Sequence, residues 1–426
     1  MSAPTRPAPG PARSEARERG ALFAIAGVRP LLGSALAWNV TLWGSLFIGT
    51  ETLSAGGASV LAVQLTGMAT WAPLLLGGAV AGSKAVGVDR LPALRRIGVT
   101  LAAVMAAIAV AMAAGAPRQL VYVATFCAGL GMLANLTLQR PALYELAGPG
   151  LGPAALALDA LGMATASCLG PLVLGFVLSL GGAEAGYVVL AGVYLLSRRL
   201  LARVPAHPPP APAPGLPPLP PPVGRRGPPR GFVGLLGVTV IVNLCYFPFL
   251  ALIPVLAGPF TDASWSVGVL AAAPGMGMIV GIGAVALRRP ARLGPLYLVG
   301  SSIALASLVP VAQATSYTMI FGALVLAGLG LSGFTATQGS LVMAAAPVDR
   351  RSQAMGLLAT AVGVLPLGTL ALGLVAERVG PVAAVTGSGL LGGVLLALWS
   401  PMWLALLRLT SGVTPPPSGA VALVES

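Results

Sequence analysis

The sequence predicts an all-α membrane protein with twelve membrane-spanning helices in two six-helix bundles. Three observations lead to this prediction. Of the 426 residues, 56% are hydrophobic and only 8% are charged, whereas a soluble globular protein carries about 25% charged residues. Apolar runs of about 20 residues, the length that crosses the hydrocarbon core of a bilayer, recur along the chain. A proline-rich segment divides these runs into two equal sets.

Twelve apolar runs are separated by charged or Pro/Gly-rich joints. The first run is the least regular, because Trp38, Asn39, Trp43 and Glu51 interrupt it. The expected spans are 30–52, 58–82, 96–115, 119–140, 154–179, 186–203, 232–256, 266–287, 294–313, 318–342, 353–376 and 382–407.

The basic residues give an independent check on this count. If the N-terminus is cytoplasmic, all of the 24 basic residues except Arg118 and Arg378 fall on cytoplasmic segments. Cytoplasmic loops of membrane proteins carry an excess of Lys and Arg, and one span fewer would destroy the asymmetry. We therefore expect a multi-pass protein of the cell (plasma) membrane with both termini cytoplasmic. Its Ala/Gly/Pro-rich composition, with Arg preferred to Lys, indicates a bacterial source.

Half of the positions in 205–230 are proline, so this segment cannot pack a core and reads as an extended or disordered tether. Docking of a proline-recognising partner is the alternative. His207, the single histidine, lies here, so no histidine proton relay is expected in the spans. The expected organisation is a cytoplasmic tail (1–29), a six-helix bundle (30–204), the linker (205–230), a second bundle (231–408) and a tail (409–426).

Several kinds of site are not expected. The arginines are dispersed, without the charge density of a nucleic-acid surface. One histidine and three scattered cysteines cannot form a metal cluster. The glycine-rich stretch from Gly77 has Ser83 where a phosphate-binding loop needs Lys, so no ATP-driven module is present. We expect no cofactor, with the proton gradient as energy source, and we expect a monomer surrounded by membrane lipid.

The two halves resemble each other. Gln139 and Gln338 precede Ala-Gly-Pro and Ala-Pro turns, and a mid-span proline follows in the fifth span of each half. Pro171 comes twelve residues after Asp159, and Pro366 comes twelve residues after Ala354. Two six-span halves of the same order indicate a parallel repeat.

Three stretches carry a resemblance to a known family: LQRPALYELAGPGLGPAALALDALG with GPLVLGF (138–176), NLCYFPFLALIPVLAG (243–258) and TQGSLVMAAAPVDRRSQAMGLLATAVGVLPLGTLALGLVAERVG (337–380). On these residues the chain resembles the major facilitator superfamily, and within it the branch of macrolide-efflux and enterobactin exporters. The resemblance covers about residues 25–410. It implies the major facilitator fold and a secondary transporter that works by alternating access, usually in the direction of export and driven by protons.

The loop after the second span departs from the pattern of that family. The family has Gly-x-x-x-Asp-Arg there, whereas Gly82 stands in place of the acid and Asp89-Arg90 comes seven residues later. The resemblance implies that this loop latches the two halves on the cytoplasmic side. Candidate residues for a variant latch are Lys84, Asp89, Arg90, Arg95, Arg350 and Arg351.

Asp159 lies in an apolar span, where an acid costs about 2.5–3.5 kcal/mol on insertion scales. Three interpretations remain open: a structural or gating ion pair with Arg140, a proton-coupling or substrate-cation residue, and a simple interfacial acid. A place in the first or second turn of span 5 would let the helix dipole favour the charge. Glu51, expected at the outer mouth of span 1, is a second coupling candidate.

The Gly170-Pro171 pair, with Gly175, predicts a bent or closely packed helix. Resemblance to exporters of the family links a comparable motif in span 5 to antiport. A gating kink and mere packing are both open, and Pro366 and Gly368 carry the same two alternatives.

In the family that the chain resembles, spans 1, 4, 7 and 10 line the substrate cavity. The polar residues on these spans are candidate substrate contacts, and interhelical hydrogen bonding is the alternative role. Trp38 and Trp43 could stack on an aromatic compound or pack between helices. The cavity candidates are Asn39, Trp43, Asn135, Gln139, Asn243, Tyr246 and Gln338.

The function that these observations favour is proton-coupled efflux of a small lipophilic or amphipathic compound, with drug resistance as a plausible biological role. An uptake symporter is the alternative within transport. A membrane-embedded enzyme would need an acidic or histidine-rich catalytic loop, and the loops carry at most one or two acids each. A non-transporting membrane receptor is the other alternative.

Overall fold

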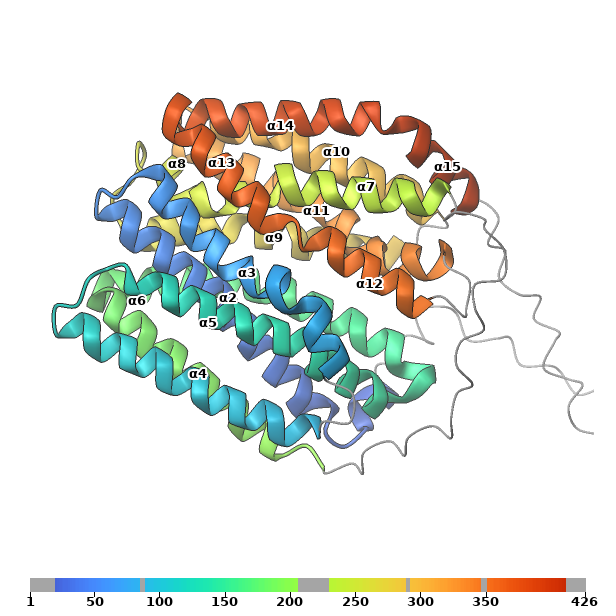
Figure 1. Cartoon of the computed structure of the whole chain (residues 1–426), viewed down its shortest axis with the longest axis horizontal. Coiled ribbons are helices and arrows are strands. Elements are labelled where there is room, and N and C mark those ends of the chain that lie inside the picture. Colours follow the sequence, from blue (N-terminus) through green and yellow to red (C-terminus); the bar gives the residue numbers. More distant parts are fainter. Residues whose placement is uncertain (1–19, 85–88, 206–229, 289–291, 346–350, 411–426) are drawn as a thin grey trace, which may run out of the picture.

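The computed structural model describes residues 20–84, 89–205, 230–288, 292–345 and 351–410, and these residues form helices with short connections and no strand. Figure 1 shows the helices running roughly parallel to one another. The expected tails and linker fall largely outside the described residues.

The helices of the first half follow the expected spans closely. They are α2 (Val28–Ala55), α3 (Val60–Lys84), α4 (Arg90–Ala113), α5 (Leu120–Ala134), the π-helical turn η1 (Asn135–Gln139) and α6 (Arg140–Ala202).

The second half contains more breaks. Its elements are α7 (Arg230–Cys245), the 3₁₀ turn η2 (Phe247–Leu252), α8 (Ile253–Ala257), α9 (Ser264–Arg288), α10 (Leu293–Ala312), α11 (Tyr317–Ala345), α12 (Arg351–Val362), α13 (Leu365–Val379), α14 (Pro381–Leu398) and α15 (Ser400–Thr410).

Eleven stretches of the described chain are long and apolar enough to cross a membrane. One of them, Gly150–Ala202, has 53 residues, and a straight helix of that length would measure about 80 Å, far more than one span needs. It breaks at Gly181 and at Gly182, which has a φ of 69° that favours glycine. The break divides α6 into spans 5 and 6, so the expected count of twelve and the all-helical membrane fold are confirmed.

Three expected spans are not single helices. Pro248 and Pro254 divide span 7 into α7, η2 and α8, because proline lacks the donor that an α-helix needs. Span 11 breaks between α12 and α13, and Pro366 lies in the first turn of α13, where proline is tolerated. Span 12, expected to reach residue 407, ends at Leu398, and α15 is a separate helix that packs on α7.

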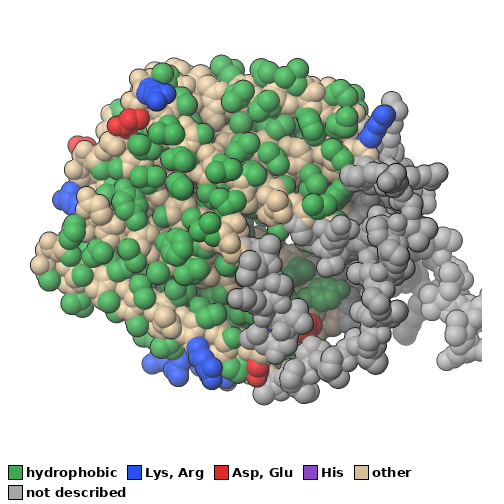
Figure 2. Space-filling model, viewed as in Figure 1, with side chains coloured by type: hydrophobic (Ala, Val, Ile, Leu, Met, Phe, Trp, Pro, Cys, Tyr) green, Lys and Arg blue, Asp and Glu red, His purple; other side chains and the backbone are tan. Residues whose placement is uncertain are grey.

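The helices end at two faces. We call the face that holds Arg95, Arg140 and Arg230 the basic end, and the opposite face, with the α2–α3 connection and Gly182, the far end. Apolar side chains cover most of the surface between them, and charged side chains are sparse there (Figure 2). This distribution matches a protein that is surrounded by lipid.

Two seams join the halves. In one, α6 packs on α9, and in the other, α3 packs on α13. The first seam is a backbone contact: a Cβ added at Gly268 would lie 2.6 Å from the Pro171 carbonyl oxygen, and one at Gly175 would lie 2.9 Å from the Gly268 Cα. A Cβ added at Gly275 would lie 2.6 Å from the Cys168 nitrogen. Glycine therefore sets the distance between spans 5 and 8.

Enlarging Gly268 is expected to open this seam. Gly268→Val would place side-chain atoms on the Pro171 carbonyl, so α9 must move away from α6. We expect a fall in the unfolding temperature in detergent and a loss of cross-linking between α6 and α9. Gly322→Val in α11 is the matched control, because nothing lies within 4 Å of a Cβ built there. Equal effects of the two substitutions would contradict this account.

Candidate substrate and coupling site

Arg140 and Asp159 form an ion pair. The Arg140 Nε donates a hydrogen bond to the Asp159 Oδ2 over 2.8 Å, and the Nη2 approaches the Met163 Sδ at 3.8 Å. The Asp159 side chain is 2% exposed and that of Arg140 is 30% exposed. The Asp159 Oδ1 is buried and has no hydrogen-bond partner among the described residues. The pair that the sequence predicts is thus present, with one carboxylate oxygen unpaired.

The structure corrects the expected depth of Asp159. The chain breaks at Gly148 (φ 74°), and Asp159 lies in the third turn of the helical segment that follows. The helix dipole acts within the first turn, so it does not account for a charge at this depth. The guanidinium of Arg140, brought back from the other side of the Gly148 break, supplies the compensating charge.

The second half has no counterpart of this pair. When Gln139 is matched to Gln338, Gly339 stands opposite Arg140. When Pro171 is matched to Pro366, Ala354, which is buried, stands opposite Asp159. Among the described residues, the buried charged side chains, Glu51 and Asp159, both lie in the first half.

A π-helical turn directly precedes Arg140. It begins at Asn135 and ends at Gln139, and both side chains are buried. The Asn135 Nδ2 donates to the Gln139 Oε1 over 3.4 Å, and the Gln139 Nε2 donates to the Leu31 carbonyl of α2 over 3.1 Å. The Asn135 Oδ1 has no partner within the described chain. Single π-helical turns occur often at functional sites, and this one rotates the end of span 4 before the ion pair.

Three other polar candidates have their side-chain donors bonded to protein. The Asn39 Nδ2 donates to the Ala35 carbonyl over 3.0 Å, and the Asn243 Nδ2 donates to the Thr239 carbonyl over 2.9 Å. The Gln338 Nε2 donates to the Thr239 Oγ1 over 3.1 Å. These bonds favour interhelical or local hydrogen bonding over substrate contact for all three.

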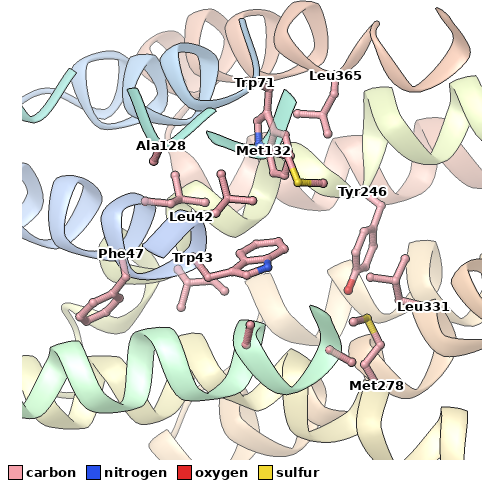
Figure 3. Packing of buried hydrophobic residues seen from close by; sticks show 14 of the residues in the cluster. Leu42, Trp43, Phe47, Trp71, Ala128, Met132, Tyr246, Met278, Leu331 and Leu365 are labelled. Carbon is pink, nitrogen blue, oxygen red and sulfur yellow. The ribbon is translucent and has the colours of Figure 1, made fainter. Parts of the chain in front are cut away.

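Two aromatic candidates lie in the centre of the molecule with unpaired polar atoms. Trp43 from α2 packs edge-to-face on Trp71 of α3, with ring centroids 6.0 Å apart. Tyr246, between α7 and η2, is fully buried. The Trp43 Nε1 and the Tyr246 hydroxyl have no hydrogen-bond partner among the described residues. Figure 3 shows both side chains in the central region between the halves, with Met132, Met278, Leu331 and Leu365 around them.

Trp38 is different from Trp43. Its Nε1 donates to the Ser197 Oγ over 2.5 Å, and its ring packs edge-to-face on Tyr194 with centroids 5.8 Å apart. Trp38 therefore packs between α2 and α6, and Trp43 is the tryptophan of this helix that faces the centre.

Glu51 lies at the far end of α2 and is 4% exposed. Its Oε1 accepts a hydrogen bond from the Ser264 Oγ of α9 over 2.9 Å. This hydrogen bond thus links the first half of the molecule to the second.

The glycines beside the mid-span prolines allow close helix packing. The helix stays regular through Pro171, and a Cβ added at Gly170 would lie 2.9 Å from the Gly44 nitrogen of α2. In the second half, a Cβ added at Gly368 would lie 2.7 Å from the Leu244 carbonyl oxygen of α7. In each half a glycine therefore allows the fifth span to pack closely on the first span.

Two of the latch candidates whose side chains the structure describes bond within the first half. Arg90 pairs with Glu145, and the Nε and Nη2 of Arg95 donate to the Leu201 carbonyl over 3.2 and 2.6 Å, so both arginines bond within the first half. Asp89 is an exposed residue at the start of α4 that makes no capping hydrogen bond with its side chain. Arg350 lies outside the described residues, and the side chains of Lys84 and Arg351 are not described.

Several contacts that cross between the halves were not predicted. Ser264 and Glu377 carried no recognisable motif, although Glu377 is one of few acids at the end of a span. The Leu61 nitrogen donates to the Glu377 Oε2 over 2.9 Å, and the Gln64 Nε2 donates to the Pro248 carbonyl over 3.1 Å.

Comparison with known proteins identifies the fold. Two crystal structures of the peptide transporter POT in complex with sulfate, one of them a glutamate-to-glutamine mutant, superpose with a TM-score of 0.67 at 13% identity, and in each case 92% of this chain covers 99% of that chain. A search of curated proteins finds no match. The family model of the Major Facilitator Superfamily matches residues 45–367. The chain therefore belongs to the major facilitator superfamily and is a multi-pass membrane transporter, not an enzyme.

Proposed function

We propose that this transporter exports a small lipophilic or amphipathic compound by alternating access and that the proton gradient drives export. The expected location is the plasma membrane of a bacterium, with the basic end and both termini in the cytoplasm, and we expect a monomer without a cofactor. A role as an antiporter in drug resistance fits this proposal.

The side chains of the central region support the proposed substrate class. Trp43, Trp71 and Tyr246 supply aromatic surface, and Met132 and Met278 supply adaptable apolar surface (Figure 3). Two unpaired polar atoms, the Trp43 Nε1 and the Tyr246 hydroxyl, could each bond a polar group of a mostly apolar compound. This cluster of aromatic and apolar side chains is the observation that carries the proposal.

The Arg140–Asp159 pair supports the proposed coupling. Its unpaired Oδ1 can take a proton, after which the neutral acid no longer compensates Arg140. A buried charge without its partner is costly, so protonation would favour a conformation in which Arg140 reaches water. The Gly148 break lies between Arg140 and Asp159 in the chain, so a movement of the joint between spans 4 and 5 would separate the pair.

The basic end offers an entry route. Figure 2 shows a recess between the two halves toward this end, in which apolar side chains and an acidic side chain are visible. The two halves are joined by hydrogen bonds at the far end. If the basic end is cytoplasmic, this arrangement corresponds to an inward-facing state that accepts substrate from the cytoplasm.

Transport into proteoliposomes tests the proposal. A fluorescent lipophilic weak base is the probe, a pH gradient is imposed in either direction, and protein orientation is determined by protease access. Export requires movement of the probe from the basic end toward the far end, opposite to the protons. Asp159→Asn is expected to abolish the response to the gradient, and Glu145→Gln, which changes the exposed Arg90 pair, is the control. Movement of probe and protons in the same direction would establish uptake instead.

A further inference from the structure

The two halves are joined at the far end by two hydrogen bonds that end on carboxylates. The Ser264 Oγ donates to the Glu51 Oε1, and the Leu61 nitrogen donates to the Glu377 Oε2, each over 2.9 Å. Glu51 and Leu61 belong to the first half, and Ser264 and Glu377 belong to the second. One accepting carboxylate therefore belongs to the first half, and the other belongs to the second half.

Both carboxylates meet the start of a helix. Ser264 is the first residue of α9, and Leu61 is the second residue of α3. The first turn of a helix has unpaired N–H groups and a partial positive charge, which favour a nearby anion. Because α3 and α9 are the second spans of the two halves, each half presents the same helix start to an acid of the other half.

Two further hydrogen bonds near the far end join the halves through neutral groups. The Ser179 Oγ accepts a hydrogen bond from the Trp265 nitrogen over 2.9 Å, which joins α6 to α9. The Gln64 side chain donates to the Pro248 carbonyl, which joins α3 to η2. Protonation leaves such bonds unchanged, whereas a hydrogen bond to a carboxylate is about twice as strong as a neutral one. Of these far-end bonds, those to Glu51 and Glu377 are therefore the ones that depend on charge.

We propose that Glu51 and Glu377 form a proton-released latch that holds the far end of the transporter closed. This inference rests on the proposed alternating-access function and adds the residues that control one of its gates. When both acids are ionised, they hold α2 on α9 and α13 on α3. When protons reach them from the far side, the charge-assisted bonds weaken and the far end opens.

Other charged groups lie on the elements around these acids. The Arg118 guanidinium lies against Gly56, at the end of α2 beyond Glu51. Arg378 adjoins Glu377 in α13, and the exposed Glu184 and Asp262 lie in α6 and before α9. The Glu184 carboxylate lies against Gly182 of its own helix, so it supplies a comparison acid on the same face.

Distances between spin labels across the far end test the latch without any substrate. Labels are placed at the exposed positions Ala114 and Ala383, after Cys127, Cys168 and Cys245 have been replaced by alanine. We expect the ratio of molecules with an open far end to molecules with a closed one to rise about tenfold in Glu51→Ala. The rise should be about threefold in Glu377→Ala, because Glu377 is exposed and its bond contributes less. The corresponding Gln variants, which keep an acceptor but no charge, are expected to give smaller rises.

Lowering the pH from about 7.5 to about 5 is expected to open wild type, and the Glu51→Gln/Glu377→Gln double variant is expected to lose this response. Distances in both Ala variants that match wild type would overturn the latch. An equal shift in Glu184→Ala would overturn it as well, since surface charge in general would then be responsible. Because the distances need no transported compound, either result leaves the proposed export to be decided by the proteoliposome assay.

Discussion

Arg140→Ala is expected to destabilise the protein more than removal of the whole Arg140–Asp159 pair. Without Arg140, the Asp159 carboxylate would be buried and unpaired, since its side chain is only 2% exposed. Removing one partner of a buried ion pair costs about 3–5 kcal/mol, whereas removing both costs much less. The double variant Arg140→Ala/Asp159→Ala should therefore unfold at a higher temperature than Arg140→Ala alone.

The unfolding temperature of both variants in detergent checks this expectation. Arg90→Ala is the control, since Arg90 pairs with Glu145 at the surface, where an ion pair contributes little. If the single and double variants lose the same stability, the pair does not act as a unit.

Trp43→Phe is expected to change substrate binding without loss of the fold. Phenylalanine keeps most of the apolar surface that packs on Trp71 but lacks the Nε1 donor, which has no partner among the described residues. A neutral hydrogen bond contributes about 0.5–1.5 kcal/mol. We therefore expect the apparent affinity for an aromatic compound with a hydrogen-bond acceptor to fall up to about tenfold.

Trp38→Phe is the matched control on the same helix. The Trp38 Nε1 donates to Ser197, so its loss leaves a buried hydroxyl with one bond fewer and should lower the unfolding temperature. Substrate affinity should stay near that of wild type. Competition binding with a set of aromatic and aliphatic compounds, together with thermal unfolding of both variants, separates the two tryptophans. Equal losses of affinity in both variants would place neither of them at the substrate.

The Arg140–Asp159 pair illustrates how far sequence reasoning reaches. The two residues flank one short joint, with the Gly-Pro turn at Gly148 between them, so a helix hairpin brings them together whatever the rest of the fold does. Their contact was therefore predictable from local geometry. The depth of Asp159 was not, because it depends on where the helix after Gly148 begins.

The contacts in the centre and at the far end, in contrast, were not predictable from the sequence. Nothing in the order of residues distinguishes Trp43 from Trp38, and nothing connects Glu51 with Ser264, more than two hundred positions away. The π-helical turn at Asn135 leaves no recognisable pattern either. These features appear only when spans from different parts of the chain pack against one another.

The sequence by itself determined the twelve spans, the repeat of two halves and the family, because apolar length and the placement of arginines act along the chain and need no partner. Only the tertiary structure decided which side chains face the centre, which glycines allow α6 and α9 to touch, and which acids form hydrogen bonds between the halves. The physical reason is that inside a bilayer all spans are similarly apolar. The hydrophobic pattern therefore predicts that a helix is surrounded by lipid or protein, but it does not predict which helices are its neighbours.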